Sequence, residues 1–179
     1  WVEALRSVAP DRTHVVARHL PDAADTLSWL RLGEFIRRQH RALAAEGLDF
    51  NDLVKQADAL EAGGERERWQ VLRDIQSTYL GILDQAQQWD RQTARLFAIR
   101  NQECQTDKQI YLVATVDLDH AMRQMLDQVA ENVTALIYAQ QEWSERFDSH
   151  GCLLPEAWED FEINIPADQI HVAQKPSDQ

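Results

Sequence analysis

The sequence predicts an α/β protein in which a mainly helical N-terminal lobe precedes a small parallel β-α-β lobe. In residues 1–105 apolar side chains recur at three- and four-residue spacing, which is the repeat of amphipathic helices. In residues 109–138 two short apolar runs flank one further amphipathic segment. Apolar runs without alternation are typical of parallel strands buried on both faces. We therefore expect a helical domain over residues 1–105 and a partial α/β segment over residues 106–179.

The first long helix is expected from residue 22 to residue 46. Pro21 and Asp22 supply a start signal for it, and Gly47 supplies a stop signal. Its expected apolar stripe consists of Leu27, Leu30, Phe35, Ile36 and Leu43. A shorter helix is expected from residue 51 to residue 62, where two glycines follow.

Two more helices are expected before the first strand. The clearer one has apolar positions at Trp69, Leu72, Ile75, Tyr79, Ile82, Leu83 and Ala86. The second runs from Asp90 to about Asn101 and includes Leu96, Phe97 and Ile99. The polar residues 102–108 then form a linker. Beyond residue 138 we expect a short helix over 141–147, a helical turn over 155–161 and a third strand over 170–173.

The β-α-β unit is the part of the sequence where ligand chemistry would be sought. Ligands of open α/β sheets bind at the carboxyl ends of strands, and Asp117 and Asp119 follow the first apolar run. One interpretation is a weak Walker-B-like acid that holds magnesium, but no G-x-x-x-x-G-K-[ST] phosphate loop is present. The favoured interpretation is that these acids cap the following helix. A small hydrolase with a metal on both acids remains a weaker alternative.

Other catalytic and metal sites find no support in the sequence. The six histidines form no H-x-x-x-H pair, and the two cysteines form no C-x-x-C pair. Asp168 and Lys175 suggest a PD-(D/E)-x-K nuclease site, but Ala173 stands where that motif needs an acid. We therefore expect no catalytic residue, no metal and no cofactor in these residues. The tryptophans, Trp29 and Trp69 in particular, are expected in the core rather than in a base-stacking surface.

Charge limits the choice of partner. The net charge is −12, so a stand-alone protein that binds nucleic acid through phosphates is not expected. Arg37, Arg38 and Arg41 are nevertheless candidate nucleic-acid contacts, and a solvated helix face with acidic neighbours is the alternative. No apolar run is long enough for a membrane span, and the first residues do not resemble a signal peptide. We expect a cytoplasmic protein without a membrane partner.

Three segments resemble a known family. Residues 68–100 (RWQVLRDIQSTYLGILDQAQQWDRQTARLFAIR) resemble a helical insertion of superfamily 1 helicases. Residues 110–139 (IYLVATVDLDHAMRQMLDQVAENVTALIYA) are similar to the element I.I.GF.DLT..Q..LL..L...V.V.I.A of AddB-type helicase-nuclease subunits. Residues 146–160 (RFDSHGCLLPEAWED) resemble the F-x-x-x-G…W segment that follows it.

The resemblance implies an internal fragment of an AddB-like protein, in which a 1B-like helical subdomain adjoins part of a RecA-like core. ATP, magnesium and the nuclease residues would belong to the parent protein only. The fragment, which starts at Trp1 rather than at Met, would be a non-catalytic scaffold for a DNA channel or a partner subunit in DNA repair. The alternative is an acidic helical module that binds another protein and has no nucleic-acid role.

Overall fold

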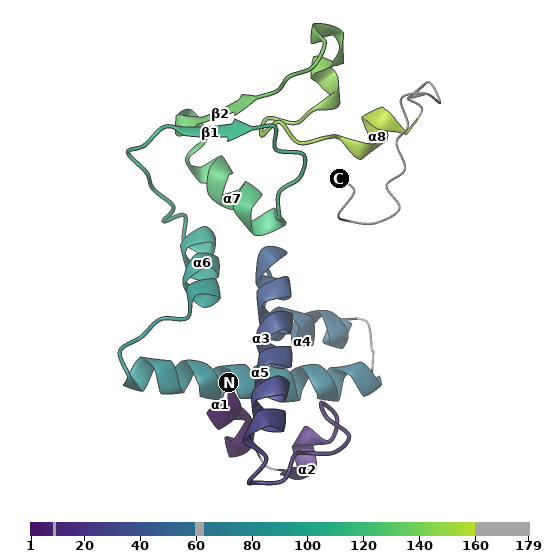
Figure 1. Ribbon diagram of the computed structural model, residues 1–179, viewed down its shortest axis with the longest axis vertical. Helices are drawn as coiled ribbons and strands as arrows, with labels where there is room; N and C mark the ends of the chain where they lie inside the picture. The colour runs from purple at the N-terminus through teal and green to yellow at the C-terminus, as the bar shows by residue number, and fades with distance from the viewer. Residues whose placement is uncertain (9, 60–62, 160–179) are drawn as a thin grey trace, which may run out of the picture. The chain divides into compact units, whose positions relative to one another are not determined.

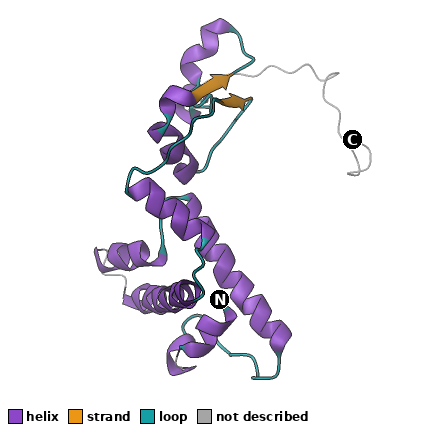
Figure 2. Cartoon of the chain, turned by 90° about the vertical axis from the view of Figure 1, so that its left-hand side faces the viewer, coloured by secondary structure: helices purple, strands orange, loops and turns teal. Residues whose placement is uncertain are grey.

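The computed structural model of the protein describes residues 1–8, 10–59 and 63–159. Within these residues the chain is mostly helical and has one small sheet of two parallel strands (Figure 2). The elements in chain order are α1 (Val2–Ser7), α2 (Pro10–Thr13), α3 (Thr26–Ala45), α4 (Phe50–Ala59), α5 (Gly63–Gln85), α6 (Arg91–Arg100), β1 (Ile110–Val113), α7 (His120–Gln128), η1 (Ala130–Asn132), β2 (Val133–Leu136), η2 (Gln141–Arg146) and α8 (Pro155–Trp158). The predicted combination of a helical part and a small α/β part is confirmed.

Contacts along the chain divide it into two compact units. The helical unit comprises Trp1–Ile110 together with Leu118–Val133, and the strand unit comprises Tyr111–Asp117 together with the chain from Thr134 onward. Helix α7 lies between the two strands in sequence but has its contacts with α3 and α6. The units therefore differ from the ranges 1–105 and 106–179 that the sequence suggested.

The core of the helical unit lies between α1, α3, α4 and α5. Figure 1 shows α5 running across α3 in this unit. The large apolar side chains of this core with almost no exposed surface are Leu5, Ile36, Phe50, Val71 and Ile75. Complete burial of a side chain of this size contributes about 1.5–3 kcal/mol to stability. Trp29 is buried and Trp69 packs against this core, so the prediction that these tryptophans belong to the core is confirmed.

The buried face of α3 differs from the predicted one. Its buried residues are Trp29, Gly33, Ile36, His40 and Ala44, which follow one another at helical spacing. Leu27 and Leu30, which belonged to the predicted stripe, are 58% and 54% exposed. The prediction counted apolar side chains only, and it therefore missed a glycine and a histidine on the buried face. Gly33 is required there because a Cβ atom would lie 2.8 Å from Cγ2 of Val2 in α1.

Helices α5 and α6 match their predictions more closely. Leu72 and Ile75 of α5 are buried, while Tyr79 and Ile82 pack against the same core. Asp90 caps α6 by accepting a hydrogen bond from the backbone N–H of Thr93 at 2.9 Å. Such a cap satisfies a donor that has no partner within the helix.

In the strand unit, β1 and β2 each alternate between half-buried and exposed residues. The exposed residues include Tyr111, Val113 and Leu136, so the expectation that both faces of these strands are buried is wrong. The apolar runs gave no sign of this difference because apolar side chains occupy both faces. Gly151 comes close to the second strand, where an added Cβ would lie 3.1 Å from Cβ of Ala135.

The rest of the strand unit consists of short segments. The short helix expected over 141–147 is the 3₁₀ helix η2, and the expected turn over 155–161 contains α8. Phe147 and Leu153 form an antiparallel bridge. The third strand expected over 170–173 lies outside the described residues.

Candidate functional site

The candidate site is a cavity within the helical unit, at the place where α3, α6 and α7 meet. Its volume is about 600 Å³. The residues that line it are Arg37, His40, Arg41 and Ala45 of α3, Tyr79 of α5, Asp90, Arg91, Gln92 and Arg95 at the start of α6, and Asp119, Met122 and Met125 at the start of α7. We call this cavity the arginine cavity because four of these residues are arginines.

Helical spacing explains how each element presents its residues. Arg37 and Arg41 are four residues apart on α3, and Arg91 and Arg95 are four residues apart on α6. Side chains at this spacing lie on the same face of a helix. The two helices therefore each present two arginines to one cavity.

A hydrogen-bonded cluster forms one wall of the arginine cavity. Its centre is Asp90, whose Oδ1 accepts hydrogen bonds from the backbone N–H of Thr93 and from Nε2 of His40, both at 2.9 Å. The other carboxylate oxygen, Oδ2, accepts from the hydroxyl of Tyr79 at 3.1 Å. Behind it, the amide of Gln76 donates to Nδ1 of the buried His40.

These contacts change the proton affinity of the cluster. Burial opposes ionisation of Asp90, but the hydrogen bonds from His40, Thr93 and Tyr79 outweigh it and lower the pKa of this carboxyl. Burial, with the nearby charge of Asp90, raises the pKa of Tyr79 to about 12. Because the cluster uses the hydrogen-bonding capacity of Asp90 internally, its role is to fix the position of α6 against α3 and α5.

The four arginines differ in how far their charge is compensated. Arg37 forms two hydrogen bonds with Glu34, at 2.6 and 2.8 Å. Arg95 forms an ion pair with Asp119. Arg41 and Arg91, in contrast, form no ion pair with any residue that the structure describes. The arginine cavity is thus a positive region in a chain whose net charge is −12.

The predicted site residues are only partly brought together. Arg37 and Arg41 line the arginine cavity, whereas Arg38 is exposed on α3 and is not among its lining residues. Arg91, Arg95 and the histidine-aspartate cluster were not predicted. The available signal was the spacing of Arg91 and Arg95 directly after the capping Asp90, but sequence alone does not show which helix faces which.

The two acids proposed as caps have separate places. Asp119 caps α7, since its Oδ1 accepts from the backbone N–H of Met122 at 2.7 Å. Asp117 belongs to the strand unit and does not line the arginine cavity. Within residues 1–8, 10–59 and 63–159 there is no group of three or more His, Cys, Asp or Glu residues that could hold a metal ion.

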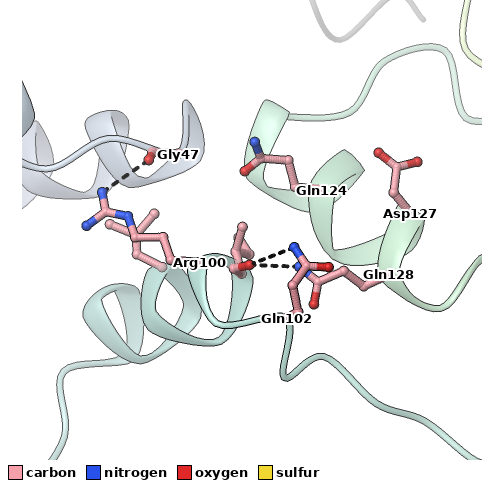
Figure 3. Close-up of a pocket in the computed structure, with 8 residues that line it drawn as sticks. Gly47, Arg100, Gln102, Gln124, Asp127 and Gln128 are labelled. Carbon is pink, nitrogen blue, oxygen red and sulfur yellow. Dashed lines mark hydrogen bonds between the residues drawn. The ribbon is translucent and has the colours of Figure 1, made fainter.

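A second cavity, of about 470 Å³, also lies in the helical unit (Figure 3). Its lining is polar, with Arg100, Gln102, Gln124, Asp127 and Gln128 among the residues shown. The charge of Arg100 is already compensated, because it pairs with Asp49 at 2.9 Å and with Asp52 at 2.5 Å.

The glutamine of α7 in this second cavity is also engaged. Gln128 donates to the carbonyl oxygen of Ile99 at 2.8 Å and accepts from the backbone N–H of Cys104 at 3.1 Å. These bonds attach α7 to the end of α6. We interpret the second cavity as a polar joint between helices rather than as a ligand site.

Comparisons with known proteins give no information on function, so the function has to be inferred from the residues of the site. No family model matches the chain, and neither the curated proteins nor the solved structures give a match. In the part of the chain that the structure describes, no helix is both long enough and apolar enough to span a membrane.

Proposed function

We propose that this chain is a non-catalytic part of an ATP-dependent helicase-nuclease of the AddB-like kind, where it helps to form a DNA channel or a subunit interface. The single observation that supports this proposal is the gathering of four arginines in one cavity of a strongly acidic chain. Contacts from arginine to phosphate supply much of the affinity of proteins for nucleic acids. The arginine cavity therefore gives the chain a local means to contact DNA despite its net charge.

The rest of the assignment follows from the same proposal. Strands β1 and β2 with α7 would be part of the RecA-like core of the parent protein, and the helices before them would be its 1B-like subdomain. ATP, magnesium and the nuclease residues would be supplied by other parts of the parent, which would act on DNA in the cytoplasm together with a partner subunit. The chain itself would neither hydrolyse ATP nor cut DNA.

Fluorescence anisotropy with a labelled single-stranded oligonucleotide tests the DNA contact. We expect binding that weakens as salt rises, with a slope of about −0.7 in log affinity against log salt for each phosphate contacted. Arg91→Gln should weaken binding and reduce this slope by one contact. Lys55→Gln is the matched control, because Lys55 is an exposed cation on α4 that does not line the cavity.

Two results would contradict the proposal. One is the absence of oligonucleotide binding by the wild-type chain at about 50 mM salt, where phosphate contacts are strongest. The other is ATP turnover by the purified chain that is lost in Asp117→Ala, because the proposal assigns no catalytic role to Asp117 or to any other residue of this chain.

A second candidate function is an acidic module that binds another protein. The observation that favours it is the exposed apolar surface of the strand unit, where Tyr111, Val113 and Tyr138 are 62%, 67% and 105% exposed. Contiguous apolar surface often marks protein-protein contacts. If this function is correct, Val113→Lys would abolish capture of a protein partner, and the wild-type chain would show no oligonucleotide binding.

A further inference from the structure

We propose that the arginine cavity binds a phosphate ester of about the size of a nucleotide, with Arg41 and Arg91 at the phosphate and Met122 and Met125 against the group that carries it. This inference goes beyond the proposed function, because a free phosphate ester needs no nucleic acid. A free ester and a nucleotide within a strand share the chemistry that the cavity would recognise.

The charges of the cavity favour an anion. Four arginines face it against two carboxylates, those of Asp90 and Asp119. Both carboxylates are already engaged, Asp90 with four donor groups of three residues and Asp119 with Met122 N–H and Arg95. The charges of Arg41 and Arg91 therefore remain for a ligand, and they come from two different helices.

Arg95, in the cavity wall, also carries an unsatisfied donor. The Nε atom of Arg95 is buried and has no hydrogen-bond partner among the described residues. A buried donor without a partner is unfavourable. Because this atom has almost no accessible surface, a ligand oxygen reaches it only after the Arg95 side chain turns it toward the cavity. A phosphate offers several such acceptor oxygens and matches the planar guanidinium group well.

The size and the apolar part of the cavity show that phosphate alone would not fill it. A volume of about 600 Å³ lies in the range of pockets that hold small organic ligands, about 300–1,000 Å³. Ala45, Met122 and Met125 supply apolar surface next to the arginines. Methionine side chains adapt their shape and make favourable contacts with aromatic rings. A ligand with a phosphate at one end and a flat ring at the other uses both parts.

Isothermal titration calorimetry with adenosine 5′-monophosphate as the probe tests this inference. We expect the monophosphate to bind at least about tenfold more tightly than either inorganic phosphate or adenosine, because each of these fills one part of the cavity only. Arg41→Gln and Arg91→Gln should each weaken binding about tenfold or more. Arg38→Gln is the matched control, since it removes the same charge from α3 outside the cavity and should leave binding unchanged.

The inference is overturned if the monophosphate does not bind, if inorganic phosphate binds equally well, or if Arg38→Gln weakens binding as much as Arg41→Gln. Thermal unfolding of each variant shows that its fold is retained. Labelled oligonucleotide separates the two proposals. Oligonucleotide binding without monophosphate binding would leave the proposed function standing and reject this inference. Monophosphate binding without oligonucleotide binding would support this inference and reject the proposed function. Displacement of the oligonucleotide by the monophosphate would show that the cavity takes its phosphate from a nucleic-acid strand.

Discussion

The side chain of Asp90 has two roles at one place in the fold. It caps α6 through Thr93, and it joins α6 to α3 and α5 through His40 and Tyr79. Loss of one member of such a cluster leaves other buried polar atoms without partners, which costs more than the bond itself contributes. The cluster therefore fixes helices α3 and α6, and with them the positions of the cavity arginines that these helices carry.

The ionisation of Tyr79 provides a test at the scale of one residue. Its pKa is raised to about 12 in the folded protein, while an unfolded chain has an ordinary tyrosine value of about 10. The stability that the neutral phenol contributes is thus present below about pH 10 and lost as the pH rises toward 12. We expect Tyr79→Phe to remove the part of the tyrosinate absorbance titration that lies above about pH 11.

Tyr111→Phe is the control for this titration, because Tyr111 lies exposed on β1. Its substitution should leave the step above pH 11 in place. A titration curve that loses this step in Tyr111→Phe and keeps it in Tyr79→Phe would contradict the assignment.

At the scale of one element, two glycines in long helices should respond in opposite ways to the same substitution. Gly33→Ala would place a Cβ 2.8 Å from the side chain of Val2, and we expect a loss of about 1–3 kcal/mol in the free energy of unfolding. Gly81→Ala in α5 meets no atom within 4 Å, and we expect a gain of about 0.5–1 kcal/mol from helix propensity. Urea denaturation measures both changes, and a stabilising Gly33→Ala would refute the close approach of α1 and α3.

Helices α3 and α5 also show which buried helix faces can be predicted from sequence. The periodicity of Leu72 and Ile75 predicts the buried face of α5, because the side chains that pack are the large apolar ones. On α3 the buried face depends on Gly33 and His40, whose burial follows from a neighbouring helix and from Asp90. Neither partner is close in sequence, so no local pattern reports them.

The residues of the candidate site could likewise be predicted only where they lie close together in sequence. Arg37 and Arg41 could be predicted because they belong to one charged segment of one helix. Arg91 is separated from them in sequence by two helices, α4 and α5, and only the fold brings it to the same cavity. The cap at Asp119 is local and was the favoured prediction for this acid, whereas its ion pair with Arg95 depends on the packing of α6 against α7.

For the whole molecule, the net charge of −12 should make stability depend on salt. Like charges on a compact chain repel one another, and unfolding separates them. Raising sodium chloride from about 10 mM to about 150 mM shortens the screening length from roughly 30 Å to roughly 8 Å. We therefore expect the melting temperature to rise over this range, as measured by differential scanning calorimetry. A melting temperature that falls with salt would mean that attractive ion pairs such as the one between Arg12 and Asp74 dominate.

The position of α7 has a consequence for how this protein can be divided and exchanged. The chain leaves the helical unit after Ile110, returns to it at Leu118 and leaves it again after Val133. No single cut can therefore release either unit with all of its parts. A gene truncated at the sequence-based boundary near residue 105 would encode a helical unit without α7, and its arginine cavity would lack Asp119, Met122 and Met125. A recombination junction between Ile110 and Val133 would therefore separate parts of at least one unit from each other.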